Sequence, residues 1–126
     1  MSDDEFSGSA SVDSQLLELQ NDYIAGLRGR ITPLMNAWQK CVNSDYAADS
    51  LQEVYRSVHA IAGTSSMLNV SPVDVFSNKA QVLIHGLMNT DDRDSALFIE
   101  LDKTLKTLEL AVLSGEVKAP PINLNG

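Results

Sequence analysis

The chain has 126 residues, of which 44% are hydrophobic and only 6% aromatic, and its net charge at pH 7 is −8. This length is typical of one domain, and the scarcity of aromatic residues favours packed helices over a β-sandwich. Surplus carboxylates repel phosphate groups, so the charge argues against nucleic-acid binding and against attachment to an anionic membrane. The single cysteine, Cys41, excludes an internal disulfide and leaves too few thiols for a cysteine-based zinc site.

Residues 1–12 are rich in Ser, Gly and Asp and contain little that a core could bury. They also lack the basic start and the apolar stretch of a signal peptide. We therefore expect a flexible acidic tail here. No run of about 18 apolar residues occurs anywhere in the chain, so we predict no membrane span and a cytoplasmic location.

Four segments follow in which apolar side chains recur every three or four residues, as in amphipathic helices. These apolar stripes run from Leu17 to Cys41, from Leu51 to Leu68, from Val73 to Leu87 and from Leu97 to Val112. Gly26, Gly29 and Pro33 interrupt the first stripe, so we expect either one bent helix or two shorter helices there. The connections are short, which favours antiparallel neighbours. Over residues 13–114, the sequence predicts an all-α fold, an up-and-down four-helix bundle with Cys41 in its core.

Residues 115–126 contain two consecutive prolines, which are incompatible with a helix. We expect this Pro-containing segment to be a second tail, or a linker.

Motifs that would indicate an enzyme are scarce. No Gly-rich phosphate loop, histidine metal pair or nucleophile elbow is present, so we expect no cofactor, nucleotide-binding or kinase activity. Asp91, Asp92 and Asp94 resemble a cation site, but the favourable interaction of acids with a helix N-terminus explains them more simply.

The charges are distributed unevenly. No Asp, Glu, Lys or Arg occurs from Ser57 to Val73. His59 lies in this uncharged segment, about 100° around the predicted helix from the buried stripe. Gly63 follows one turn later, although a mid-helix glycine costs about 1 kcal/mol relative to alanine. An exposed imidazole among small residues is suited to act as a nucleophile towards a large partner.

Residues 59–69, with the sequence HAIAGTSSMLN, resemble the signature of histidine-containing phosphotransfer (HPt) domains. In that family a His is followed by two residues, Lys, Gly, small residues, then Leu and usually Gly, on the second helix of a four-helix bundle. His59, Gly63, residues 64–66 and Leu68 match this pattern. Two positions differ. Ala62 replaces the usual Lys, which helps to neutralise the phosphoryl group, and Asn69 replaces the usual Gly, although Asn also tolerates the left-handed conformation that ends helices.

The resemblance implies a phosphorelay intermediate of two-component signalling. His59 would accept a phosphoryl group from the aspartate of one response-regulator receiver domain and pass it to another receiver domain. The implied partners are receiver domains and a hybrid sensor kinase. Mg²⁺ is expected only in the partner receiver domain, and we expect this chain to be a monomer.

Other residues acquire roles from their positions relative to His59. Arg56, one turn earlier, is a candidate to stabilise the phosphate in place of the missing Lys, and a surface pair with Glu53 or Gln52 is the alternative. Lys79, on the third predicted helix, is a second candidate. The expected docking surface consists of Tyr55, Ala62, Gly63 and Ser66.

Two alternative functions remain open. The chain could be a binding-only HPt-like module that docks on a receiver or kinase without phosphotransfer, or a structural bundle that forms oligomers. We interpret His85 as an ordinary helix histidine, because it lacks the motif that surrounds His59. Met67 and Leu68 are expected to pack in the core at the end of their helix, and a groove for a partner is the alternative.

Overall fold

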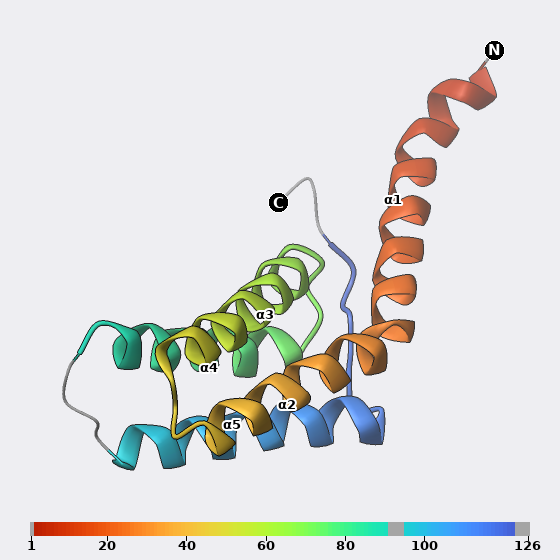
Figure 1. Cartoon of the computed structure of the whole chain (residues 1–126). Coiled ribbons are helices and arrows are strands. Elements are labelled where there is room, and N and C mark those ends of the chain that lie inside the picture. Colours follow the sequence, from red (N-terminus) through yellow and green to blue (C-terminus); the bar gives the residue numbers. More distant parts are fainter. Residues whose placement is uncertain (1, 91–94, 123–126) are drawn as a thin grey trace.

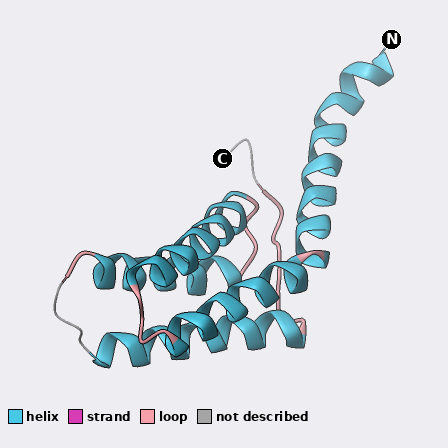
Figure 2. Cartoon of the chain, in the orientation of Figure 1, coloured by secondary structure: helices cyan, strands magenta, loops and turns pink. Residues whose placement is uncertain are grey.

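The computed structural model describes residues 2–90 and 95–122, and over these residues it contains five α-helices. They are α1 (Ser2–Ala25), α2 (Leu27–Asn43), α3 (Ala48–Met67), α4 (Val73–Met88) and α5 (Ser95–Ser114). Successive helices from α2 to α5 run in opposite directions and are joined by loops (Figures 1 and 2). Each packs against the next, and α2 also contacts α5. The predicted all-α, up-and-down four-helix bundle is confirmed. Asp91, Asp92 and Asp94 lie outside the described residues.

The first apolar stripe forms two helices, which resolves the alternative that the sequence left open. The break lies at Gly26, whose backbone N–H is shared between the carbonyls of Asp22 and Tyr23, each at 3.1 Å. Such shared hydrogen bonds are common at helix ends. Pro33 lies inside α2 without ending it.

Helix α1 runs from Ser2 to Ala25, and the flexible tail expected over residues 1–12 stays a prediction. Figure 1 shows the first half of α1 projecting away from the bundle, whereas its last turns lie against the bundle. Extending an existing helix is easier than starting a new one, and no proline interrupts this segment. The anchored end of α1 therefore allows the helix to continue through residues whose composition favours a flexible tail.

The C-terminal segment contacts the bundle as far as residue 122. Gly115, with φ of 76°, ends α5 in the left-handed conformation. Ser71 and Lys118 then exchange two backbone hydrogen bonds of 2.7 Å. Val117 and Ile122 pack against the core. Two prolines exclude a helix, but they permit this extended segment.

Gln20 joins α1, the end of α3 and the C-terminal segment. Its side chain is 1% exposed, and its Nε2 donates to the backbone oxygens of Leu68 at 2.8 Å and Pro120 at 2.9 Å. Asn69 Nδ2 donates to the same Pro120 oxygen at 3.3 Å. Gln20, a polar residue within the first apolar stripe, is therefore the centre of a hydrogen-bonded junction.

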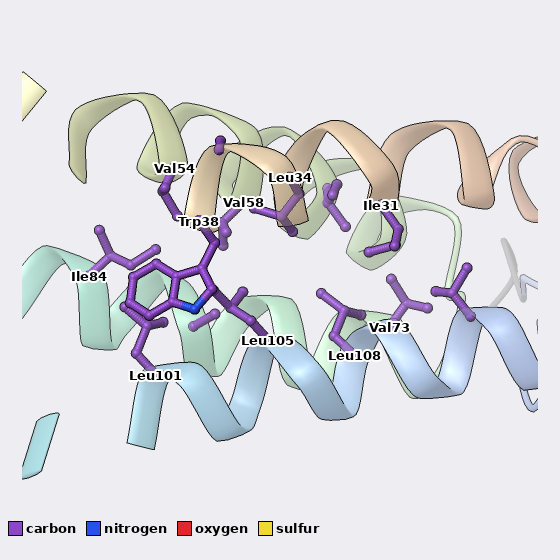
Figure 3. Packing of buried hydrophobic residues seen from close by; sticks show 14 of the residues in the cluster. Ile31, Leu34, Trp38, Val54, Val58, Val73, Ile84, Leu101, Leu105 and Leu108 are labelled. Atoms are coloured by element: carbon purple, nitrogen blue, oxygen red, sulfur yellow. The ribbon is translucent and has the colours of Figure 1, made fainter. Parts of the chain in front are cut away.

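The core lies between α2, α3, α4 and α5, and each of these helices contributes apolar side chains to it (Figure 3). Cys41 is buried there, as predicted. Trp38 closes one end of the core and donates from Nε1 to Asp102 Oδ1 at 2.9 Å. Burial acts to raise the pKa of Asp102, but hydrogen bonds from Trp38 and Lys106 outweigh it and hold that pKa below its usual range. None of the described helices is both long enough and apolar enough to cross a membrane.

Candidate functional site

His59 lies in the middle of α3, and its side chain is exposed as the sequence predicts. The preceding residue, Val58, is completely buried and belongs to the core. Since successive helix residues are about 100° apart, His59 lies on the flank of the helix. Its contacts show that this flank faces α4, because the imidazole is bonded to Gln81 of that helix.

The hydrogen bond between His59 and Gln81 indicates which ring nitrogen of His59 is the donor. His59 Nδ1 lies 2.9 Å from Gln81 Oε1. An amide oxygen can only accept, so Nδ1 must carry the proton. In the neutral ring the lone pair is then on Nε2, which is the nitrogen on the opposite side from Gln81. This arrangement leaves Nε2, the nitrogen that carries the lone pair in the neutral ring, outside the contact with α4.

Tyr55, one turn before His59 on α3, covers one face of the imidazole. The two ring centroids are 5.6 Å apart and the planes differ by 16°, so the rings are stacked. Tyr55 also contacts His85 of α4, with centroids 6.3 Å apart. The ring of His59 is therefore held by a hydrogen bond at one edge and by an aromatic ring on one face.

A third side-chain contact also joins α3 to α4. Asn78 Nδ2 of α4 donates to Ser66 Oγ of α3 at 2.9 Å. Because α3 and α4 are antiparallel, the pairs Ser66–Asn78, His59–Gln81 and Tyr55–His85 follow one another along their boundary. We call these six residues the α3–α4 seam.

The residues beside the α3–α4 seam are either small or apolar. A Cβ atom added at Gly63 would have no other atom within 4 Å, so the backbone beside His59 is open to an approaching molecule. Val82 follows Gln81, and Met67 follows Ser66; each is 70% exposed. The prediction that Met67 packs in the core is therefore wrong, whereas the prediction for Leu68, which is buried, is confirmed. Met67 is the last residue of α3 and does not lie on the buried face of that helix, whereas Leu68 follows the helix end.

One residue of the predicted docking surface is misplaced. Ala62 is 2% exposed, so its methyl group lies inside the bundle and cannot contact a partner. It is one residue after Ile61, which is also buried. Gly63 and Ser66 are exposed, and Tyr55 is partly exposed, in agreement with the prediction.

The two basic candidates have different environments. Lys79 Nζ forms an ion pair with Glu100 Oε1 of α5 at 2.6 Å, and this hydrogen bond holds the pKa of Glu100 below its usual range. Lys79 therefore faces α5, and the structure does not bring it to His59. Arg56 is exposed, and the alternative pair with Glu53 is not formed, because Glu53 instead lies 3.7 Å from Lys40. The role of Arg56 as a phosphate partner stays a prediction.

Gln81 is the site residue that sequence reasoning missed. It follows the buried Ala80, just as His59 follows the buried Val58, so both flank their apolar stripes. That shared position is a signal in the sequence, but many polar residues have it. The pairing itself becomes visible only when the register of α3 against α4 is known.

Over residues 2–90 and 95–122, no three His, Cys, Asp or Glu side chains are grouped so that they could hold a metal ion. No protein-family model, curated protein or solved structure matches the chain.

Proposed function

We propose that this protein is a histidine phosphotransfer protein, which accepts a phosphoryl group on His59 from a receiver-domain aspartate and passes it to another receiver domain. One observation carries this proposal: the hydrogen bond from His59 Nδ1 to Gln81 Oε1 leaves Nε2 as the nucleophile on an exposed surface. The resemblance of residues 59–69 to the HPt signature supports the same assignment. Phosphorelay of this kind implies a cytoplasmic protein.

The proposed transfer needs little chemistry from this chain. The Nε2 lone pair attacks phosphorus, the bond from phosphorus to the aspartate oxygen breaks, and its electron pair returns to the carboxylate. As the nitrogen–phosphorus bond forms, the imidazole becomes positively charged. The Gln81 oxygen, which accepts the Nδ1 proton, stabilises this developing charge. Mg²⁺ and the acidic cluster that binds it are expected in the partner receiver domain.

The environment of His59 is suited to docking by a large partner. The open backbone at Gly63 permits close approach, and no charged residue occurs from Ser57 to Val73. The exposed side chains of Met67 and Val82 supply apolar area that a partner can bury. We therefore place the receiver domain over the α3–α4 seam.

A binding-only module is the second candidate function, and one feature favours it. The position of the usual Lys is occupied by the buried Ala62, and Lys79 is paired with Glu100. Arg56 is then the remaining candidate to stabilise the phosphate. If its guanidinium does not reach the phosphoryl group, docking on a receiver or kinase would take place without phosphotransfer.

Incubation with phosphorylated receiver domains and Mg²⁺ distinguishes the two functions. The proposed function predicts that phosphate is transferred to this protein in an acid-labile, base-stable form, as expected for a phosphoramidate. Binding to receiver domains without transfer would instead support the binding-only module. An absence of both binding and transfer would contradict both functions.

We predict that Gly63→Glu weakens receiver binding at least tenfold, because it places a bulky, charged side chain in the centre of the docking surface. The fold should be retained, since the position is open and Glu is a better helix former than Gly by roughly 0.5–1 kcal/mol. Titration calorimetry measures the affinity, and urea denaturation measures the stability.

Gly29→Glu is the matched control. Gly29 is also an exposed helical glycine with no atom within 4 Å of an added Cβ, but it lies near the start of α2. Receiver binding should be unchanged in this variant. Equal affinities of the two variants would show that the α3–α4 seam is not the docking surface.

We predict that Gln81→Leu slows phosphoryl transfer to His59. A hydrogen bond of this kind contributes about 0.5–1.5 kcal/mol, so the rate constant should fall roughly two- to tenfold. Imidazole ¹⁵N chemical shifts should also show a loss of the preference for the Nδ1 proton. Gln39→Leu is the control, because it removes an exposed side-chain hydrogen bond to Asn43 on α2, outside the α3–α4 seam. If Gln81→Leu changed neither the rate nor the tautomer, Gln81 would have no role in positioning the imidazole.

A further inference from the structure

From Val12 to Leu19, helix α1 carries apolar side chains that the bundle does not cover. Val12 is 43% exposed, Leu17 is 53% exposed and Leu19 is 52% exposed. Val12, Leu16, Leu19 and Tyr23 follow a four-three-four spacing, which is the spacing of a coiled-coil seam. Tyr23, at the end of this row, is buried against the bundle, and its hydroxyl donates to Ile61 O at 3.3 Å. The apolar row therefore starts at the bundle with Tyr23 and continues towards the N-terminus of α1.

The charge of this segment is exclusively negative. Residues 1–27 contain six acidic and no basic side chains, so they carry −6 of the net charge of −8. Asp13, Glu18 and Asp22 are exposed beside the apolar row. A binding helix that packs its leucines against this row would bring its own flanking residues close to these carboxylates. Basic flanking residues would be attracted, and acidic ones would be repelled.

The same charges disfavour a second copy of this chain as the occupant. Two α1 helices would bring like charges together, and the whole chain is also strongly acidic. Helix α5 exposes Leu110 and two lysines, but Glu100 and Asp102 accompany those lysines, and Lys106 is paired with Asp102 at 2.9 Å. Its surface therefore offers no uniformly basic face to α1.

An uncovered helix is also unfavourable on its own. Isolated helices of this length are marginal in water, and Gly and Ser in the first half of α1 lower helix propensity further. Packing of the apolar row against a second helix would supply the missing stabilisation. We propose that the face of α1 formed by Val12, Leu16 and Leu19 is a docking surface for a basic amphipathic helix of a partner protein. This binding site is separate from His59 and does not depend on phosphotransfer.

Two synthetic three-heptad peptides with equal numbers of lysines test this proposal with the full chain. One has Leu at both core positions of each heptad, and the other has Ser there. The leucine peptide should bind at least ten times more tightly by fluorescence anisotropy, and its binding should raise the helix content of the mixture seen by circular dichroism. Leu19→Ser should remove most of this preference while the fold is kept, because Leu19 is exposed.

Leu110→Ser, at an exposed leucine of α5, is the matched control and should retain the preference. Equal binding of the two peptides would show attraction by charge alone and would overturn the proposal. An equal effect of Leu19→Ser and Leu110→Ser would overturn it too. Self-association of the chain in sedimentation, abolished by Leu19→Ser, would identify a second copy as the occupant instead.

Discussion

Replacement of His59 by Gln should abolish labelling by phosphorylated receiver domains. Both histidines have the same intrinsic nucleophile, so their surroundings decide which one reacts. His59 has its Nδ1 proton bound by Gln81, an aromatic ring on one face and the open backbone of Gly63 one turn away. Gln is similar in size and polar, and His59 is exposed, so the variant should keep its fold and melting temperature.

His85→Gln is the matched control, since His85 is exposed on the neighbouring helix and contacts the same Tyr55. Both ring nitrogens of His85 lie near Asn89 Nδ2, at 3.3 and 3.4 Å, and among the described residues the ring has no side-chain acceptor comparable to Gln81. Labelling should therefore remain intact in this variant. Undiminished labelling of the His59→Gln protein would show that another residue is the acceptor.

Replacement of Gln20 by Leu should have the largest effect on stability among the substitutions considered. Leu has a similar size but no donor, so the buried Leu68 oxygen and the partly buried Pro120 oxygen would each lose a hydrogen bond. An unsatisfied buried acceptor costs about 1–3 kcal/mol, and Pro120 O keeps its hydrogen bond from Asn69, so we expect the free energy of unfolding to fall by about 1–3 kcal/mol. Urea denaturation monitored by circular dichroism measures this change.

Gln15→Leu provides the comparison for Gln20→Leu. Gln15 is an exposed glutamine of the same helix, so its replacement should change the stability by no more than about 0.5 kcal/mol. Equal stabilities of the two variants would show that the junction around Gln20 does not hold α1 and the C-terminal segment on the bundle.

The bundle itself follows from local features of the sequence. The spacing of Leu51, Val54, Val58 and Ile61 creates one apolar face, and such a face is stable only when another helix covers it. Short connections then require antiparallel neighbours. The exposure of His59 follows from the same periodicity, because it lies beside the stripe that contains Val58. The left-handed turn at Asn69, with φ of 57°, agrees with the known tolerance of Asn for this conformation.

The two ends of the chain depended on contacts that composition does not reveal. Ser, Gly and Asp favour a flexible start, and consecutive prolines favour a flexible end. Gln20 joins α1 to the end of α3 and to the C-terminal segment, because it donates to the backbone oxygens of Leu68 and Pro120, which any residue at those positions would present. A hydrogen bond to a backbone oxygen does not depend on the side chain of the acceptor residue, so the sequence does not reveal it.

The register of α3 against α4 determines which side chains meet at the candidate site. Periodicity indicates that His59 and Gln81 each flank an apolar stripe, but it does not indicate that they face each other across α3 and α4. It likewise left Ala62 as a surface residue and Lys79 as a phosphate partner, whereas packing buries the first and directs the second to Glu100. Amino-acid order thus specifies which face of each helix is apolar, because that depends on residues one turn apart. Which polar flanks meet depends on how two helices are rotated and shifted against each other, and only the packed core sets that geometry.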